Sequence, residues 1–420
     1  MPMAPVSQHR ASSSPPERVV VTGVGMVTSI GTGKDVFWRN LLAGCCGISR
    51  VEAFSTEQFP VHCGAEVKDF AADAYLHRLR TREVGRASQL AIAAARLALQ
   101  DAAISMAEMD LEQVGIAVGT TSGEPGQIES VDDLYVEERF GQISPSFIEM
   151  YPCSVLAAHI AAELELGGEV LTIPTACAAG NYAIAHASDV LRAGRAKIML
   201  AGGADSFSRI TYAGFSRLGA ISPELCRPFD RGRKGMIPGE GSAMLVLERL
   251  SDARRRGARV YAEIAGYGLS CDAHHMTAAH PQGEGAARAM EIALRASGTL
   301  PEDVDYISAH GTGTPTNDRL ETIAIKRVFN DHAYRVPISS IKSMLGHSMG
   351  AASAIEATAC VLAITDGYVP GTINLENQDP ECDLDFVPNQ ARHHKVDIAM
   401  NNAYAFGGNN SSIVFKRCEA

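Results

Sequence analysis

Arg18-Val-Val-Val-Thr-Gly-Val-Gly25 is an apolar run that ends in two spaced glycines, and Arg259-Val-Tyr-Ala-Glu-Ile-Ala-Gly-Tyr-Gly268 repeats this pattern in the second half of the chain. Both stretches have the composition of a buried β-strand. Each is followed, after different insertions, by an Ala-rich stretch with apolar residues at helical spacing, at 87–101 and 286–296. A pattern that recurs in the same order indicates an internal duplication.

The repetition continues further along both halves. A strand and a Gly/Thr loop follow each helix, at 114–123 and 304–314, and the helix that Cys177 opens has its counterpart in the segment from Gly346 to Glu356. Apolar runs such as Lys197-Ile-Met-Leu200 are typical of a sheet covered on both faces. The sequence therefore predicts an α/β fold of two halves, 18–255 and 256–420, whose mixed sheets stack through shared helices. The active site is expected where equivalent loops of the halves meet.

Composition excludes several classes of protein. Lys and Arg number 37 against 48 Asp and Glu, a net charge of −11, which argues against a nucleic-acid binder. Ten cysteines without a C-x-x-C motif are typical of small apolar side chains in a reducing cytosol. Residues 1–17 are Ser/Pro-rich and are predicted to be a disordered leader. Since no run of about 18 apolar residues is evident, a soluble cytoplasmic protein without a membrane segment is expected.

Thr175-Ala-Cys177-Ala-Ala-Gly180 lies between a strand-like run at 170–173 and an Ala-rich helix. A thiol at a helix N-terminus is favoured as the thiolate by the helix dipole and by free N–H groups. The small neighbours leave access for a substrate, so Cys177 is a candidate nucleophile. From this motif alone, a buried structural cysteine remains the alternative.

Two histidines occupy comparable loop positions in the second half. His310 follows a strand and precedes Gly-Thr312-Gly-Thr314, and His347 opens a helix whose dipole lowers the pKa of its imidazole. A neutral imidazole can donate a hydrogen bond to a developing oxyanion. Either histidine alone is compatible with a structural role. Together with a cysteine in the corresponding loop of the other half, they predict a nucleophilic catalytic site.

These motifs, with the Ala405-Phe-Gly-Gly408 turn, resemble in order and spacing the type II elongating β-ketoacyl-[acyl carrier protein] synthases. The segments 227–235, 239–241 and 382–388 support the resemblance, which extends over about residues 18–417. Some segments resemble specialised members, of the nodulation type or of type II polyketide and polyene synthesis, at least as well. The resemblance implies a thiolase-type αβαβα fold and decarboxylative Claisen condensation with malonyl-carrier. It also implies either a homodimer or a heterodimer with a chain-length-factor homologue.

The resemblance also implies a role for each matching residue. Cys177 would hold the acyl chain, and its backbone N–H and that of Phe406 would form the oxyanion hole. His310 and His347 would stabilise the enolate that forms as carbon dioxide leaves. Electrostatic and orienting roles fall to Lys342 and Glu356. The hydroxyls of Thr312 and Thr314 would bind the pantetheine arm, although simple loop packing is the alternative for both.

The turn before the last strand departs from the family pattern. The usual Asn-Ser-Phe-Gly-Phe-Gly-Gly reads Asn402-Ala-Tyr404-Ala405-Phe406-Gly-Gly408 here. Alanine has less backbone freedom than glycine, so Tyr404, Ala405 and Phe406 are predicted to form a stiffer acyl gate with altered chain selectivity.

No NAD, ATP or metal is expected. The resemblance implies that the phosphopantetheine is carried by the acyl carrier protein and is not a cofactor of this chain. Carrier proteins are acidic, so a chain of net charge −11 needs a local positive patch to attract one. The candidates are Arg78, Arg80, Arg82, Arg86 and Arg217, with Arg231, Arg233 and Lys234 adjoining; a charged surface helix is the alternative. A priming or thiolase-like enzyme and a non-catalytic chain-length-factor-like partner are further alternatives, but retention of Cys177 argues against the latter.

Overall fold

The computed structural model describes residues 17–419, so the predicted leader lies outside the described residues except for Glu17. The first half contains β1 (Val19–Thr28), β2 (Gly31–Thr32), α1 (Lys34–Leu42), β3 (Ser49–Arg50), β4 (Cys63–Gly64), α2 (Arg86–Asp101), β5 (Val114–Gly119), α3 (Pro125–Val136), α4 (Phe147–Met150), α5 (Val155–Leu164), β6 (Val170–Ile173), α6 (Ala179–Arg192), β7 (Ile198–Asp205), α7 (Arg209–Arg217), β8 (Gly241–Arg249) and α8 (Leu250–Arg255).

The second half begins with β9 (Ala262–Cys271) and continues with α9 (Glu284–Ser297), β10 (Tyr306–Ser308), α10 (Pro315–Phe329), β11 (Ile338–Ser339), α11 (Lys342–Leu345), α12 (Ala352–Asp366), β12 (Tyr368–Val369), β13 (Arg392–His393), β14 (Ile398–Tyr404) and β15 (Asn409–Lys416). Three short 3₁₀ turns carry residues of the predicted site: η6 (Ala176–Ala178), η9 (Met349–Ala351) and η10 (Phe406–Gly408).

The strand order shows the duplication directly. The main sheet runs β11-β10-β14-β15-β9-β1-β8-β7-β5-β6, so the order β1-β8-β7-β5-β6 of the first half is matched by β9-β15-β14-β10-β11 in the second. The halves join through β1 and β9, which pair antiparallel over only three residues of each strand. Because this pairing is short, the two five-stranded parts can diverge beyond it and leave room for helices between them.

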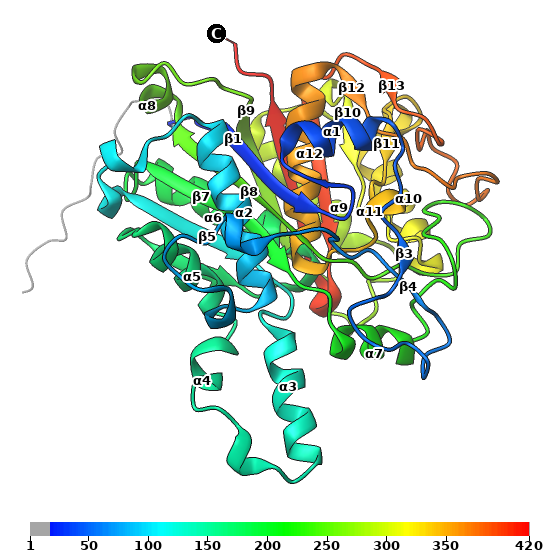
Figure 1. The fold of residues 1–420 in the computed structure, drawn as a ribbon. Coiled ribbons are helices and arrows are strands. Elements are labelled where there is room, and N and C mark those ends of the chain that lie inside the picture. The colour runs from blue at the N-terminus through cyan, green and yellow to red at the C-terminus, as the bar shows by residue number, and fades with distance from the viewer. Residues whose placement is uncertain (1–16, 420) are drawn as a thin grey trace, which may run out of the picture.

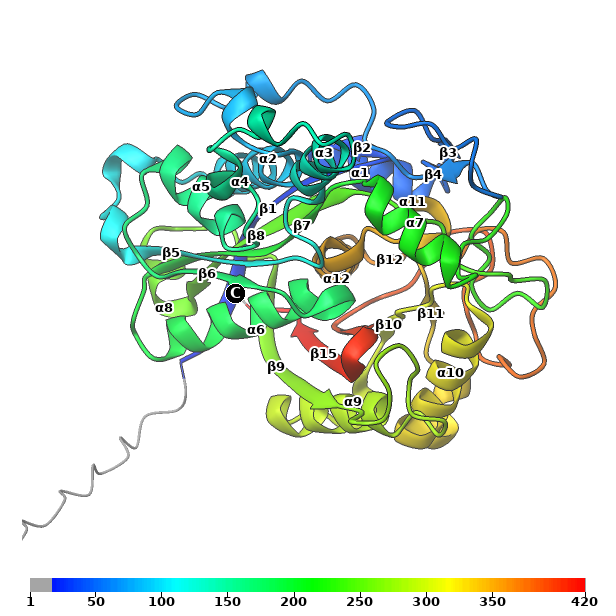
Figure 2. The same cartoon turned by 90° about the horizontal axis from the view of Figure 1, so that it is seen from below.

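The helices form three layers around the two parts of the sheet, as the predicted αβαβα architecture requires. α6 and α12 pack on each other and contact strands of both halves. α2 and α5 cover the outer face of the first half, and α9 and α10 lie on the outer side of the second. Figure 2 shows α12 near the centre with the blue α2 and the yellow-green α9 on opposite sides.

The spaced glycines that mark the repeat serve the same contact in both halves. A Cβ on Gly25 of β1 would collide with the backbone of α2 at Ala94, and a Cβ on Gly268 of β9 would collide with the backbone of α9 at Ala289. Each long Ala-rich helix therefore packs directly on the strand that the sequence pattern pairs with it.

α12 corrects one expectation from the sequence. The helical stretch Met349–Asp366, which includes η9, is long and apolar enough to cross a membrane, although no such run was expected. It is the single stretch of this kind among residues 17–419, and 89% of it is buried inside the protein. A helix that is apolar on all sides is explained by its position between the two halves, where every face meets protein.

One part of the first half stands apart from these layers. α3, the following loop and α4 project from the body of the molecule (Figure 1). This arm exposes the large apolar side chains of Tyr135, Val136, Phe140 and Ile148. β6 lies at the end of the strand order and is partly exposed. The arm thus adds exposed apolar surface, and β6 forms an edge of the main sheet.

We predict that Gly180→Ala destabilises the protein by about 1–3 kcal/mol, the usual cost of overpacking. A Cβ at Gly180 would lie 2.7 Å from the backbone nitrogen of Ala354 and 2.9 Å from the Oγ of Ser353, so α6 and α12 would have to separate. The change in the midpoint of urea unfolding measures the effect. Gly214→Ala in α7 is the matched control, because no atom lies within 4 Å of the added Cβ. Equal effects of the two substitutions would contradict the prediction.

Candidate active site

Cys177 lies in η6, between the end of β6 and the first turn of α6. The residue before it, Ala176, has a φ of 50°, a left-handed conformation that costs a residue with a Cβ about 1 kcal/mol or more. The chain thus turns sharply from strand to helix and places Cys177, with its side chain largely buried, at the inner end of a cavity.

The same turn occurs in the other half. Met349 begins η9 before α12 and also has a φ of 50°, so Gly350 occupies the position that corresponds to Cys177. The N–H of Gly350 donates to the carboxylate of Asp205 at 2.7 Å. This carboxylate shows that the turn is able to bind a negatively charged oxygen.

The predicted oxyanion hole combines the backbone N–H groups of Cys177 and Phe406. The turns that contain these residues, η6 and η10, contact one another. Both residues line the same cavity, and the oxyanion hole stays a prediction.

His310 follows β10, and its backbone is fixed by a carboxylate from α10. Glu321 accepts the N–H groups of His310 and Gly311, each at 2.8 Å. The Nζ of Lys342 lies 3.5 Å from Nδ1 of His310. Because an ammonium only donates, this contact favours the tautomer with the proton on Nε2, which leaves His310 an N–H to donate into the cavity.

His347 lies between α11 and η9, and its backbone is fixed by bonds to the segment before β8. Its N–H donates to the carbonyl of Ile237 at 2.7 Å, and its carbonyl accepts from Gly239 at 2.9 Å. The rings of His310 and His347 are 5.5 Å apart, centroid to centroid, and nearly perpendicular. Burial and the nearby Lys342 hold the pKa of both imidazoles well below the ordinary value. Both rings are therefore neutral near pH 7, as predicted for His347.

Lys342 and Glu356 form a buried ion pair through Nζ and Oε1. Burial raises the pKa of Glu356 to about 7, although Lys342 opposes this shift. Neither residue lines the cavity. Lys342 contacts both Glu356 and His310, and the electrostatic and orienting roles of the pair stay predictions.

The thiol of Cys177 differs from the expectation. The helix N-terminus was expected to favour the thiolate, but burial raises the pKa of Cys177 to about 12, even with Lys342 lowering it. Desolvation of a charge on a fully buried sulfur outweighs the favourable dipole here. Cys177 is thus a thiol in the free protein.

A cavity of about 210 Å³, partly open to solvent, unites most of the predicted residues. Cys177, His310 and His347 line it, and so do Thr312, Thr314, Tyr404, Ala405 and Phe406. Sequence reasoning missed Phe215, Met236, Asp272 and Asn410, which also line the cavity. No local pattern marks them, because each reaches the cavity through a tertiary contact.

Two aromatic rings of the predicted gate each contact another ring at the cavity. The ring of Tyr404 is buried 5.7 Å from that of His310, and the ring of Phe406, which is partly exposed, lies 5.7 Å from that of Phe215. Ala405 has an extended backbone that any residue adopts. Alanine therefore fits this state without strain and restricts only other conformations of the turn.

The predicted carrier-protein patch needs correction at two arginines. Arg233 is buried, and Arg86 is half-buried in a bond to the buried carboxylate of Glu240 at 2.9 Å. Both stabilise the interior and cannot serve as free surface cations. Arg78 and Arg80 are exposed but paired with Glu165 and Glu83, at 2.6 Å and 3.7 Å. Arg82 is exposed, and Arg217 lines a surface groove beside α3.

Comparisons with known proteins agree with this geometry. The models "Beta-ketoacyl synthase, N-terminal domain" and "Beta-ketoacyl synthase, C-terminal domain" match residues 16–253 and 261–376. The chain is 41% identical to a 3-oxoacyl-[acyl-carrier-protein] synthase 2 of Synechocystis, over 96% of this chain and 98% of that protein.

Among solved structures, the ishigamide ketosynthase/chain length factor is 43% identical, with a TM-score of 0.93, over 96% of this chain and all of that one. A ketosynthase structure described as AntDE:AntF, a type II PKS acyl-carrier protein in complex with its ketosynthase bound to the hexaketide, is 34% identical with a TM-score of 0.88, at the same coverage.

The chain therefore belongs to the β-ketoacyl synthase family and has the thiolase-type fold. It is an enzyme of the 3-oxoacyl-[acyl-carrier-protein] synthase kind, which carries out decarboxylative condensation in fatty-acid or polyketide biosynthesis.

We predict that alkylation of Cys177 by iodoacetamide accelerates about tenfold per pH unit from pH 7 to pH 10 without a plateau, because the reactive thiolate is scarce well below the thiol pKa of about 12. Lys342→Met should slow alkylation at every pH, since the ammonium lowers the pKa of Cys177. Mass spectrometry of the Cys177 peptide measures the rate, with the exposed Cys45 as an internal reference. Lys68→Met, which removes an exposed ammonium, is the control. A plateau below pH 8 would refute the prediction.

Proposed function

We propose that Cys177 receives an acyl chain from an acyl carrier protein and that His310 and His347 support its condensation with malonyl-carrier, to give a β-ketoacyl-carrier two carbons longer. The observation that carries this proposal is the convergence of all three side chains on one cavity. Cys177 comes from the first half and both histidines from the second, as expected if the duplicated loops form one site.

In the first step the sulfur of Cys177 attacks the acyl thioester carbonyl. The thiol loses its proton as the new carbon–sulfur bond forms, and the pantetheine thiolate leaves and takes up a proton. Negative charge on the tetrahedral oxygen is stabilised by the N–H groups of Cys177 and Phe406. Because Cys177 is otherwise protonated, acylation depends on charge stabilisation at the moment of attack.

In the second step the carbon–carbon bond to the malonyl carboxylate breaks and carbon dioxide leaves. The electron pair passes to the thioester oxygen, where His310 Nε2–H and the imidazole of His347 stabilise the enolate. The enolate carbon then attacks the acyl carbonyl, the carbon–sulfur bond to Cys177 breaks, and the departing thiolate takes up a proton, which restores the thiol. Neutral imidazoles suit this step, since a strong acid would quench the carbanion by protonation.

The carrier arm would enter past Thr312, Thr314 and Phe406, which line the cavity. We place the carrier protein against Arg78, Arg80, Arg82 and Arg217, the exposed members of the predicted patch. Pairing with Glu165 and Glu83 lowers the net charge that Arg78 and Arg80 present, so Arg82 and Arg217 are the stronger candidates. We place the reaction in the cytoplasm, since all ten cysteines are free thiols.

A dimer fits the surface of the first half. The arm of α3 and α4 exposes an apolar surface, and the edge of β6 has unpaired backbone groups that a second chain can cover. A second candidate role is the catalytic half of a heterodimer with a chain-length-factor homologue. The solved ishigamide relative, described as a ketosynthase/chain length factor, favours this possibility.

We predict that incubation of the protein, purified alone, with an acyl-carrier adds one acyl mass at Cys177, and that subsequent malonyl-carrier gives the β-ketoacyl product. Mass spectrometry follows both steps, and Cys177→Ala should abolish the adduct. An adduct without condensation by the isolated chain would favour the heterodimer. Identical behaviour of Cys177→Ala and wild type would overturn the proposed function.

We predict that Ala405→Gly combined with Tyr404→Phe shifts the acyl-length profile towards chains that require a wider opening of the gate. The freedom that glycine restores is worth about 0.5–1 kcal/mol, so the ratio of kcat/KM between long and short acyl-carriers should change about 2- to 5-fold. Gly126→Ala in the exposed arm is the control, since its Cβ meets no atom within 4 Å. An unchanged profile in the double variant would rule out a selective gate.

A further inference from the structure

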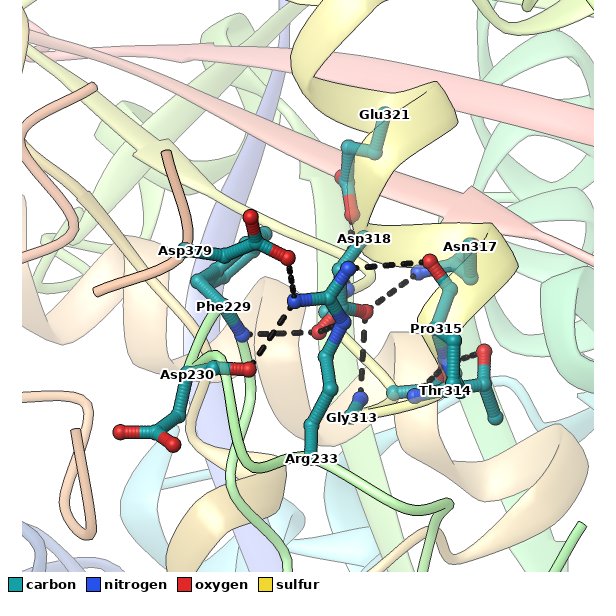
Figure 3. A network of polar contacts seen from close by, with 12 residues as sticks. Phe229, Asp230, Arg233, Gly313, Thr314, Pro315, Asn317, Asp318, Glu321 and Asp379 are labelled. Atoms are coloured by element: carbon teal, nitrogen blue, oxygen red, sulfur yellow. Dashed lines mark hydrogen bonds and ion pairs between the residues drawn. The ribbon is translucent and has the colours of Figure 1, made fainter. Parts of the chain in front are cut away.

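Backbone N–H groups of the loop from His310 to Thr314 donate hydrogen bonds to two carboxylates on one turn of α10. Glu321 accepts the N–H groups of His310 and Gly311. Asp318, three residues before Glu321, accepts the N–H of Gly313 at 3.1 Å and that of Phe229 at 2.8 Å. Figure 3 shows both acids pointing towards this loop. The backbone of the loop thus follows the position of these two carboxylates.

Two buried carboxylates on one helical turn repel each other and lose hydration. Asp318 and Glu321 are both fully buried, and burial raises the pKa of both, that of Glu321 to about 8. Asp318 contributes to the shift of Glu321 through its negative charge. A cation beside Asp318 therefore favours the ionised form of that carboxylate.

Arg233 supplies that cation. Its Nε lies 3.8 Å from Oδ2 of Asp318, and its Nη1 pairs with Asp379. Nη1 also donates to the carbonyl of Asp230 at 2.9 Å, and Nη2 donates to the carbonyl of Pro315 at 3.0 Å. The side chain is only 4% exposed. Arg233 therefore bridges its own loop, the start of α10 and the segment around Asp379, as Figure 3 shows.

Gly313, which donates to Asp318, lies between two threonines of the cavity lining. Thr312 and Thr314 flank Gly313 and line the cavity, and their hydroxyls bond to each other at 2.8 Å. Gly313 has a φ of 78°, and a Cβ there would lie 2.9 Å from the carbonyl oxygen of Gly235, two residues beyond Arg233. The loop of Arg233 thus contacts the threonine loop through backbone as well as through charge.

We propose that Arg233 is a positioning residue that, through Asp318, sets the place of Thr312 and Thr314 and so the affinity for the pantetheine arm of the substrate. This inference rests on the proposed function, in which those threonines bind that arm. Without the guanidinium, Asp318 would take up a proton, and one of its two oxygens would stop accepting an N–H group. The threonine loop would then lose an anchor, while Glu321 would continue to hold His310.

The test compares Arg233→Met with wild type in transfer of an acyl group from acyl-pantetheine to Cys177. The expected result is a KM about tenfold higher with kcat reduced less than about threefold, because arm binding is weakened while the reacting groups stay in place. Alkylation of Cys177 by iodoacetamide, which needs no arm, should keep its wild-type rate. Lys326→Met removes a partly exposed ion pair between α10, the helix of Asp318, and Asp383, and is the matched control, with no change expected.

Loss of a buried charge partner can also unfold a protein, so a double variant is required. Arg233→Met/Asp318→Asn removes the cation together with the fully buried carboxylate, so that only the less buried Asp379 loses its partner, and should recover most of the melting temperature. The raised KM should persist, because an asparagine side chain has one acceptor oxygen where the carboxylate had two. A return of KM to the wild-type value in the double variant overturns the inference. The inference is also overturned if kcat and the alkylation rate of Arg233→Met both fall in proportion to its unfolded fraction while KM stays at the wild-type value.

Thr314→Val separates this inference from the proposed function. If Thr314→Val leaves KM for acyl-pantetheine unchanged, the assignment of the arm to this loop fails. If Thr314→Val raises KM and the folded Arg233→Met does not, the role of Arg233 fails by itself.

Discussion

The close contact between α6 and α12 is the constraint on which the site depends. Gly180 lets the backbone of α6 approach Ala354 of α12, and the N–H of Asn181 donates to Ser353 at 3.1 Å. Asn401 of β14 adds bonds to Asn181 and to the carbonyl of Ser353 at 2.9 Å and 2.8 Å. These buried bonds fix the two helices relative to each other. Since Cys177 precedes one helix and His347 the other, the helix contact also sets the distance between nucleophile and histidine.

Duplication explains how one turn came to serve two purposes. The turns before α6 and α12 share a left-handed first residue and an N–H at the second position, at Cys177 and Gly350. In the second half the N–H of Gly350 donates to the carboxylate of Asp205. The same carboxylate also accepts the N–H groups of Thr121 and Ser122. In the first half the equivalent residue, Cys177, lines the cavity. A structural anion in one half and a transient oxyanion in the other therefore use the same backbone geometry.

Much of this architecture could be predicted because it is local or repeated. The paired glycine-ended strands, the Ala-rich helices and the cysteine and histidine loops each have a pattern within a short window. Contacts between distant segments have no such pattern: Phe215 against Phe406, Asp205 on Gly350 and Arg233 among carboxylates were not foreseen. Arg86 and Arg233 were misjudged because a sequence shows charge and not burial. The membrane-like composition of α12 was missed, and its burial follows only from the stacking of the halves.

Burial also decides which side chains of the site are charged and which are neutral. Cys177, His310 and His347 are all held neutral by desolvation, against the ordinary effect of a helix terminus on the thiol. Lys342 forms a buried ion pair with Glu356, behind the residues that line the cavity. The neutral thiol and imidazoles meet a thioester without prior charge separation. Charge then develops in the reacting groups, where the N–H donors of the predicted oxyanion hole would stabilise it.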